Sequence, residues 1–270
     1  MAVIHDGIIY RAADAHTHIY PEKIAAKATA NVGNFYGIEM DEIGLPEVLY
    51  KEGTEVGIER FLVCSVATKV EQVGSINRFI AETCAEYPAF IGLAAWHQDI
   101  TDIEEELDRI EAAGLRGIKV HPDFQHFNID DEKMLPFYAA CQRRGLPILF
   151  HMGDDRMDFS SPVRLARVLD KLPDLTCIAA HLGGYQRWEE AIEVLRGANV
   201  YVDTSSTLFA VEPEKARRSI EHFGVDKTMF GTDFPMWTHK EELNRFFAME
   251  YGEAENRKIL YDNFAKLFAL

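Results

Sequence analysis

Short apolar runs alternate with amphipathic stretches along nearly the whole chain. The apolar runs are rich in Val, Ile, Leu and Phe and are bounded by turn-forming residues, a pattern that predicts buried strands. Stretches with apolar residues three or four positions apart predict helices. The predicted strands are residues 12–18, 60–66, 90–96, 117–121, 147–151, 176–181, 200–204 and 228–233.

Helical stretches separate these strands. The clearest lies between Thr101, which is expected to cap the helix, and Gly114, which is expected to end it. The predicted helices are residues 22–32, with a loop at 33–37, and then 46–56, 72–87, 101–113, 131–144, 162–171, 188–196, 213–223, 240–250 and 254–268.

Eight strands joined by helical crossovers predict a closed parallel (β/α)8 TIM barrel. A doubly wound open sheet is the alternative, but that fold usually has a Gly-rich phosphate turn after its first strand, where this chain has two histidines. No linker rich in Pro, Gly and Ser divides the chain. Residues 1–270 are therefore expected to form one domain.

Composition narrows the function classes. With 44 acidic against 28 basic residues, the formal charge of −16 disfavours binding to nucleic acid or to an anionic membrane surface. The sequence contains neither a long apolar run nor a secretory leader, so a cytoplasmic location is expected. The four cysteines show no C-x-x-C spacing and are expected to be buried free thiols.

Residues that can bind metal gather at the ends of the predicted strands. His16 and His18 share one face of the first strand and can clamp one ion. Taken singly, a histidine at a strand end is more often a satisfied capping residue, and an aspartate there is often a turn residue. The carboxyl ends of barrel strands meet at one mouth, so the whole set predicts a metal site. The other members are Lys119, His121, His151, His181 and Asp233.

Five motifs in this order resemble the amidohydrolase superfamily, in particular the compact branch called amidohydrolase family 2. They are Asp-Ala-His-Thr-His, Gly-Ile-Lys-Val-His-Pro, Phe-His-Met-Gly, Ala-His-Leu-Gly-Gly and Phe-Gly-Thr-Asp-Phe-Pro. The resemblance covers nearly the whole chain. It implies a metal-dependent TIM-barrel enzyme, and the short segments outside the barrel imply one without the accessory β-sandwich of many relatives.

The resemblance also implies roles for individual residues. The expected ligands of a divalent ion, with Zn²⁺ favoured over Mn²⁺ or Fe²⁺, are His16, His18, His151 and Asp233. Asp233 is also expected to transfer protons, and His181 is expected either to assist catalysis beside the ion or to bind a second ion.

The number of ions depends on the fourth strand. In the binuclear members of the superfamily, a lysine at the position of Lys119 is carbamylated and bridges two metals. In the mononuclear branch that lysine is unmodified and is followed by His-Pro, as His121-Pro122 is here. One ion is therefore favoured, and His121 either faces the site or orients a loop.

Two substrate-binding candidates are weaker. Arg156 can bind a substrate carboxylate, but it follows two aspartates and can instead be paired locally. Trp96 ends the third strand and can either line a pocket or pack a loop onto the barrel. The expected partner is thus a small molecule such as a carboxylate, and a homodimer is the default assembly.

Three functions are compatible with these residues. Hydrolysis of a small ester, lactone or amide by a metal-activated water is expected first. Non-oxidative decarboxylation of an unsaturated or aromatic acid is the alternative, and the lack of long insertions, which decarboxylases of this branch often carry, favours hydrolysis. A metal-free binding scaffold is disfavoured by the intact ligand set.

Overall fold

The computed structural model describes residues 2–195 and 197–270. The chain divides into two compact units. Unit 1 comprises Met1–Val63, Tyr87–Ile91 and Thr204–Leu270, and unit 2 comprises Cys64–Glu86 and Gly92–Asp203. The single domain expected over the whole chain stays a prediction.

Unit 2 is built on a parallel sheet. In the spatial order of the sheet its strands are β10 (Val200–Asp203), β9 (Cys177–Ala179), β8 (Ile148–Phe150), β7 (Ile118–Val120) and β6 (Ala94–Ala95). Register pairs Ile118 with Ile148, Ile148 with Cys177, and Cys177 with Val200. Every residue of these strands is buried, which is why they read as continuous apolar runs.

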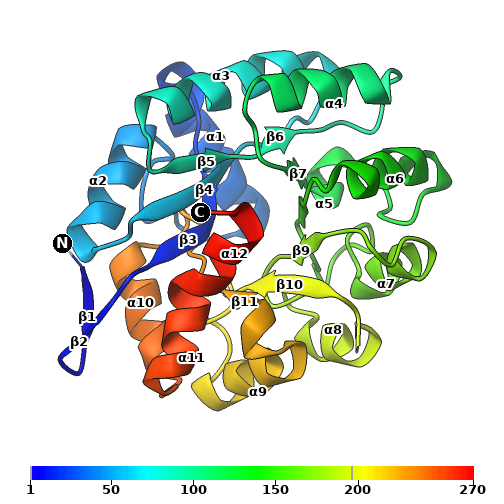
Figure 1. The fold of residues 1–270 in the computed structure, drawn as a ribbon. Coiled ribbons are helices and arrows are strands. Elements are labelled where there is room, and N and C mark those ends of the chain that lie inside the picture. The colour runs from blue at the N-terminus through cyan, green and yellow to red at the C-terminus, as the bar shows by residue number, and fades with distance from the viewer. Residues whose placement is uncertain (1, 196) are drawn as a thin grey trace. The chain divides into compact units, whose positions relative to one another are not determined.

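Helices of unit 2 flank this sheet (Figure 1). They are η1 (Val70–Gln72), α3 (Val73–Glu86), α4 (Ile103–Ala112), α5 (Pro122–Gln125), η2 (Glu132–Met134), α6 (Leu135–Arg144), α7 (Pro162–Lys171) and α8 (Trp188–Val194). In α7, Leu165, Val168 and Leu169 form the buried stripe. This spacing of three and four residues is the amphipathic pattern that the sequence predicted.

Unit 1 contains the first strands of the chain and its last strand. A hairpin of β1 (Val3–His5) and β2 (Ile8–Tyr10) precedes a sheet of β3 (Ala13–His18), β4 (Arg60–Cys64) and β5 (Phe90–Gly92). The segment after β11 (Thr228–Met229) runs parallel to β3, where Asp233 N donates to His16 O at 2.9 Å and His18 N donates to Phe234 O at 2.7 Å. This pairing joins the two segments that carry the predicted ligands.

The helices of unit 1 follow in chain order. They are α1 (Glu22–Tyr36), α2 (Pro46–Val56), α9 (Pro213–Phe223), η3 (Val225–Lys227), α10 (His239–Phe247), α11 (Glu253–Arg257), the π-helical turn η4 (Lys258–Asp262) and α12 (Asn263–Phe268). Helix α10 packs against α2. Thr238 caps α10 through a 3.3 Å hydrogen bond from Glu241 N.

The elements differ from the sequence predictions in several places. The hairpin of β1 and β2 and the short helix α5 were not predicted, and the expected strand at residues 90–96 is divided into β5 and β6. Residues 33–36, expected as a loop, belong to α1, because Gly33 lets the chain approach so closely that a Cβ there would lie 2.7 Å from Ile38 O. Asp102, rather than Thr101, caps α4 by accepting from Glu105 N. The expected helix at 254–268 contains the π turn η4. The end expected at Arg196 for the helix that begins at Trp188 lies outside the described residues.

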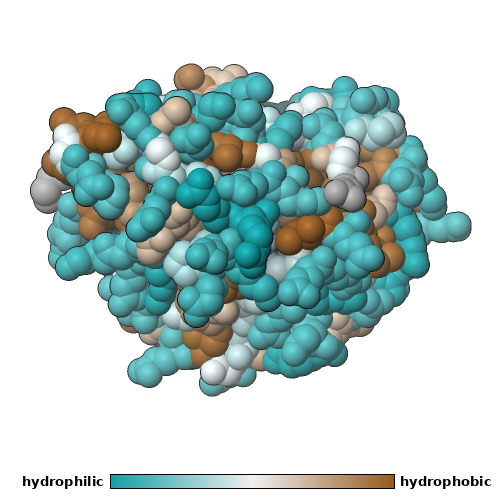
Figure 2. Space-filling view, turned by 90° about the horizontal axis from the view of Figure 1, so that it is seen from below, coloured by the Kyte–Doolittle hydropathy of each residue, from teal (hydrophilic) through white to brown (hydrophobic). Residues whose placement is uncertain are grey.

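Hydrophilic residues cover most of the face shown in Figure 2, with separate hydrophobic patches between them. This agrees with the large acidic excess of the sequence. Throughout the described parts of the chain, no helix combines the length and the apolarity needed to cross a lipid bilayer.

Candidate metal centre

Three of the four predicted metal ligands lie together in unit 1. Asp233 Oδ1 is 3.3 Å from His18 Nε2 and 3.7 Å from His16 Nε2. Neighbouring ligand atoms around a tetrahedral zinc are separated by about 3.4 Å, given Zn–N and Zn–O bonds of about 2.0–2.2 Å. The triad therefore has the spacing of a metal site. His16 and Asp233 are buried and His18 is partly buried, so protein surrounds the site.

Two consecutive serines contact the ligands His16 and Asp233 through hydrogen bonds. Ser205 Oγ lies 3.0 Å from His16 Nδ1, which leaves Nε2 of that ring as the nitrogen facing Asp233. Ser206 Oγ donates to Asp233 Oδ2 at 2.6 Å, and Oδ1 of the same carboxylate faces the histidines. Outer hydrogen bonds of this kind fix the orientation of metal ligands.

Asp233 occupies an unusual backbone conformation. Its φ is +65°, in the left-handed region that residues other than glycine seldom adopt. Its backbone N donates to His16 O, and Ser206 holds its side chain. These hydrogen bonds offset the free energy that the left-handed backbone conformation costs, and they turn the carboxylate toward β3.

A buried ionic triad lies beside the metal ligands. His239 Nδ1 is 2.6 Å from Glu52 Oε2, and His239 Nε2 is 2.9 Å from Asp14 Oδ2. Burial by itself lowers the pKa of His239, but hydrogen bonds and charge from Asp14 and Glu52 outweigh that effect and raise it to about 9. His239 is therefore a cation near neutral pH. His239 was not singled out in the sequence, although it follows the Phe-Gly-Thr-Asp-Phe-Pro motif by only four residues.

The predicted histidines of unit 2 form a second group. His151 Nε2 lies 3.1 Å from Gly153 O, and because a carbonyl oxygen can only accept, this nitrogen carries a proton. His151 Nδ1 lies 3.0 Å from His181 Nε2. Both ring nitrogens of His151 thus have protein partners. The role of His151 as a fourth ligand stays a prediction and requires one of these contacts to open.

His121 and Asp123 adjoin His151. Ligand atoms of these three residues lie within 4.8 Å of one another, but the two imidazole rings stack in parallel, 3.8 Å apart at an angle of 8°. A histidine binds metal in the plane of its ring, and two parallel rings at this separation cannot both direct a lone pair at one ion. The stacked geometry therefore does not suit a shared ion. His121 Nδ1 instead accepts from Phe124 N and caps α5.

Asp123 is a buried carboxyl that the sequence did not single out. Burial raises its pKa to about 6, against the lowering effect of the hydrogen bond from Ser160. Asp123 Oδ1 is without a hydrogen-bond partner among the described residues. Asp123 Oδ2 accepts the Ser160 bond and lies 3.6 Å from His151 Nε2. The position of Asp123, three residues after the strand end at Val120, could have marked it as a candidate site residue.

The remaining candidates lie in unit 2. Lys119 is buried on β7, with 1% of its surface exposed. Arg156 makes side-chain hydrogen bonds of 2.9 and 2.6 Å to the buried carboxylate of Asp154, the local pairing that the sequence left open. Trp96 stacks on Phe137 with ring centroids 3.9 Å apart. The substrate-binding roles of Arg156 and Trp96 stay predictions.

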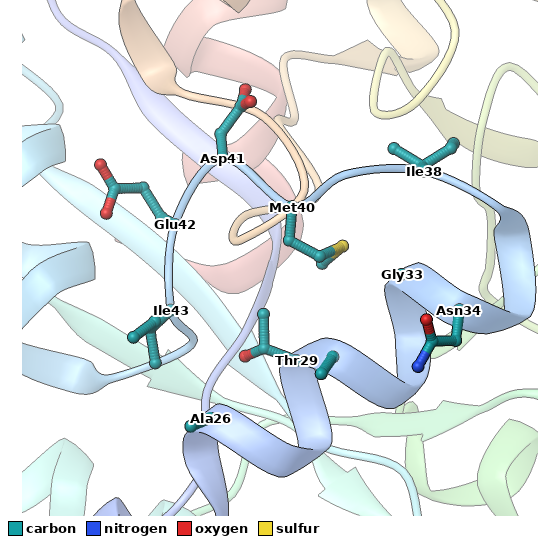
Figure 3. Close-up of a pocket in the computed structure, with 10 residues that line it drawn as sticks. Ala26, Thr29, Gly33, Asn34, Ile38, Met40, Asp41, Glu42 and Ile43 are labelled. Carbon is teal, nitrogen blue, oxygen red and sulfur yellow. The ribbon is translucent and has the colours of Figure 1, made fainter.

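A hollow of about 560 Å³ lies between α1 and residues 38–43. Figure 3 shows Met40 turned toward α1, while the carboxylates of Asp41 and Glu42 point away from it. The lining contains none of the predicted ligands. The loop that lines this hollow nevertheless contacts the segment that follows the predicted ligand Asp233, because Glu42 N donates to Pro235 O.

The chain has parallel strands with helices between them. Two histidines and one aspartate lie together beside these strands, as in metal sites of TIM-barrel proteins. Residues 13–270 match the family model described as Amidohydrolase. The chain belongs to this amidohydrolase family and is an enzyme of the amidohydrolase superfamily.

Known proteins with similar sequences or folds agree with this assignment. The 2-amino-3-carboxymuconate-6-semialdehyde decarboxylase of Dictyostelium discoideum is 26% identical over 201 residues, covering 66% of this chain and 52% of the relative. The chain thus spans about half the length of that curated relative. A TIM-barrel protein of Bordetella bronchiseptica matches with a TM-score of 0.76 and 21% identity, covering 96% of this chain and 98% of the other.

A third similar protein bears on the reaction. A dihydroxybenzoic acid decarboxylase of Polaromonas sp. JS666, solved with manganese and the inhibitor 2-nitroresorcinol, matches with a TM-score of 0.76 and 18% identity over 97% of both chains. The structural matches confirm the predicted (β/α)8 barrel fold.

The comparisons overturn the expectation that hydrolysis is the main reaction. The curated relative and the Polaromonas protein are both decarboxylases. The absence of long insertions therefore did not identify the reaction of this chain. One ligand set can serve both reactions, so the strand-end residues could not distinguish them.

Proposed function

We propose that this protein is a metal-dependent, non-oxidative decarboxylase of an unsaturated or aromatic carboxylic acid. The sequence relationship to a decarboxylase, in a chain with an assembled triad of His16, His18 and Asp233, carries the proposal. The hydrogen bonds from the two serines support it, because they direct Nε2 of His16 and Oδ1 of Asp233 to a common point.

The triad would hold one divalent ion. Two imidazoles and one carboxylate with open positions suit Zn²⁺, Mn²⁺ and Fe²⁺ alike. Zinc is the ion expected from the sequence, and manganese is the ion in the Polaromonas structure. When bound, the ion supplies a positive charge that attracts the substrate's carboxylate and an adjacent oxygen and draws electrons from them.

The protein must also supply a proton. Loss of CO₂ breaks a carbon–carbon bond and leaves its electron pair on the remaining carbon, which takes up one proton. No oxidant or reductant is needed. His181 Nε2 lies 3.0 Å from His151 Nδ1, a hydrogen-bond distance that requires a proton between the two nitrogens, and this contact supports the predicted role of His181 in proton transfer. Asp233, whose Oδ2 accepts a hydrogen bond from Ser206, stays the second residue predicted to transfer a proton.

The substrate class follows from the same chemistry. A carboxylate with a hydroxyl or amino-bearing carbon next to it offers two donor atoms to one ion. Dihydroxybenzoic acids with a hydroxyl group ortho to the carboxyl group and 2-amino-3-carboxymuconate-6-semialdehyde both have this arrangement. A small acid of this kind is the proposed partner, and the predicted homodimer is unaffected by the choice.

The test is release of CO₂ by the metal-loaded protein. The protein is stripped with a chelator, reloaded with Mn²⁺ or Zn²⁺, and given a panel of dihydroxybenzoic acids and 2-amino-3-carboxymuconate-6-semialdehyde. One CO₂ per acid consumed is expected with at least one of the two ions, and none from the stripped protein. His16→Ala is the inactive control, and Ser219→Ala is a matched active control, since its hydroxyl donates to Lys215 O within helix α9.

Failure is equally measurable. If the protein binds either ion stoichiometrically but releases no CO₂ from any acid of the panel, the proposed reaction is rejected. CO₂ release that survives complete removal of metal rejects the role of the triad.

A further inference from the structure

The buried ionic triad of Asp14, Glu52 and His239 joins three separate elements of unit 1. Asp14 lies on β3, Glu52 on α2, and His239 is the first residue of α10. Asp14 and His239 have no exposed surface. His239 also donates from its backbone N to Glu52 Oε1 at 2.6 Å, so both its main chain and its ring are held by one carboxylate.

Asp14 uses its other contacts to join two strands. Its Oδ1 accepts from His16 N and from Thr232 N, each at 3.0 Å. Its Oδ2 accepts from Thr232 Oγ1. His16 is itself a proposed ligand, and Thr232 directly precedes the ligand Asp233. One carboxylate therefore sets the spacing between the two backbone segments that carry the metal-binding side chains.

His239 holds that carboxylate from the opposite side. Nε2 lies 2.9 Å from Asp14 Oδ2, so the positive charge of the imidazole ring attracts this carboxylate at close range. Rotation of Asp14 away from β3 would separate it from the cation and would also break its bonds to His16 and Thr232. The strands and helix α10 are thereby coupled through a single side chain.

Stability alone is a weak reason for such an arrangement. Burying charges costs solvation, and well-packed apolar residues often stabilise a protein as well as a buried ion pair does. A buried ion pair does have one property that an apolar pair lacks, because moving either partner away leaves an uncompensated buried charge, which is strongly unfavourable. That property is useful where ligand atoms must be kept at set distances before the ion arrives.

We propose that the His239–Asp14 pair is a positioning device that holds His16 and Asp233 at metal-binding distance. Glu52 anchors His239 for this purpose. The inference rests on the proposed metal centre, but it does not depend on which acid is decarboxylated. Neither Asp14 nor His239 belongs to the proposed ligand set, so both would act through the ligands.

The test measures metal affinity rather than turnover. Asp14→Asn, His239→Gln and the double variant are loaded with Co²⁺, whose visible absorption reports the arrangement of its ligands, and the dissociation constant is obtained by competition with a chelator. Each single variant is expected to weaken binding by about 10–100-fold, the usual effect of losing an outer partner of a metal ligand. The cobalt spectrum is expected to change in intensity and position.

Coupling within the pair gives a sharper criterion. If His239 acts through Asp14, the double variant binds metal no more weakly than the weaker single variant. Leu243→Ala is the matched control, because Leu243 is a buried apolar residue of the same helix. It is expected to lower the unfolding temperature while leaving the dissociation constant and the spectrum unchanged.

Several results would overturn the proposal. These are an unchanged dissociation constant and cobalt spectrum in folded His239→Gln, and independent, multiplicative effects in the double variant. If His239→Gln does not fold, Thr232→Val removes one bond to Asp14 from the other strand and must also weaken cobalt binding. Wild-type protein that binds cobalt tightly but releases no CO₂ would reject the proposed reaction and leave the positioning role standing.

Discussion

Replacement of Ser206 by alanine tests whether the metal ligands are held in advance. The Ser206 hydroxyl donates to Asp233 Oδ2 at 2.6 Å and lies 3.1 Å from Trp237 Nε1, which donates to it. The substitution removes both bonds without adding volume. Asp233 then keeps its backbone hydrogen bond to His16 but loses the side-chain contact that turns Oδ1 toward the two histidines.

The size of the effect can be estimated from the bond that is lost. A hydrogen bond to a charged group contributes about 1.5–3 kcal/mol. If all of it serves to orient the carboxylate, binding of the ion weakens by roughly 10–100-fold, which corresponds to about 1.4–2.8 kcal/mol. The measured effect of deleting outer partners in other metal sites covers the same range. We therefore expect Ser206→Ala to raise the dissociation constant for Mn²⁺ and Zn²⁺ by this factor.

The assay is competition with a chromophoric chelator at fixed pH, with unfolding curves measured in parallel. Ser219→Ala is the control, because Ser219 is also a buried serine but its hydroxyl donates to Lys215 O in α9. The control should bind metal as wild type does. A dissociation constant for Ser206→Ala within about twofold of wild type would refute the idea that this bond orients Asp233.

Two further predictions concern stability. Metal at about one hundred times its dissociation constant should stabilise the fold by about 2.7 kcal/mol, raising the unfolding temperature by about 5–10 °C, and calorimetry with and without chelator should show this shift in wild type but not in His16→Ala. The second prediction follows from Asp123, whose pKa burial raises to about 6. Folding then favours the protonated form, so wild type should lose stability relative to Asp123→Asn, by up to about 3 kcal/mol, as the pH rises from about 4 through about 6. Urea unfolding across that range measures the difference, and a constant difference would contradict the burial argument.

Much of the local structure was predictable from the sequence. The expected strand at residues 147–151 contains β8, and the helices at 46–56 and 162–171 have the bounds of α2 and α7. These elements have strong periodicity and clear ends. The error at residues 33–36 arose because Gly33 was taken as a loop residue, whereas it permits a close approach between α1 and the Ile38 carbonyl.

The candidate site was predictable in part. His16 and His18 are two residues apart in a strand, so alternation alone places them on one side. Their approach to Asp233 depends on pairing between β3 and a segment more than two hundred residues later. The stacking of His121 on His151 was not predictable, because the strand ends show which residues are neighbours but not how two rings are oriented.

The sequence by itself determined the succession of strands and helices and the types of residue at the strand ends, because hydrophobic periodicity and local turn chemistry act over a few residues. Tertiary structure alone decided which polar groups form hydrogen bonds to the predicted metal ligands at the strand ends. Ser205, Ser206 and His239 lie more than 180 residues after His16 and resemble ordinary helix caps or surface residues in the sequence. Their contacts with the ligand segments exist only because strand pairing and helix packing bring those parts of the chain to within a few ångströms.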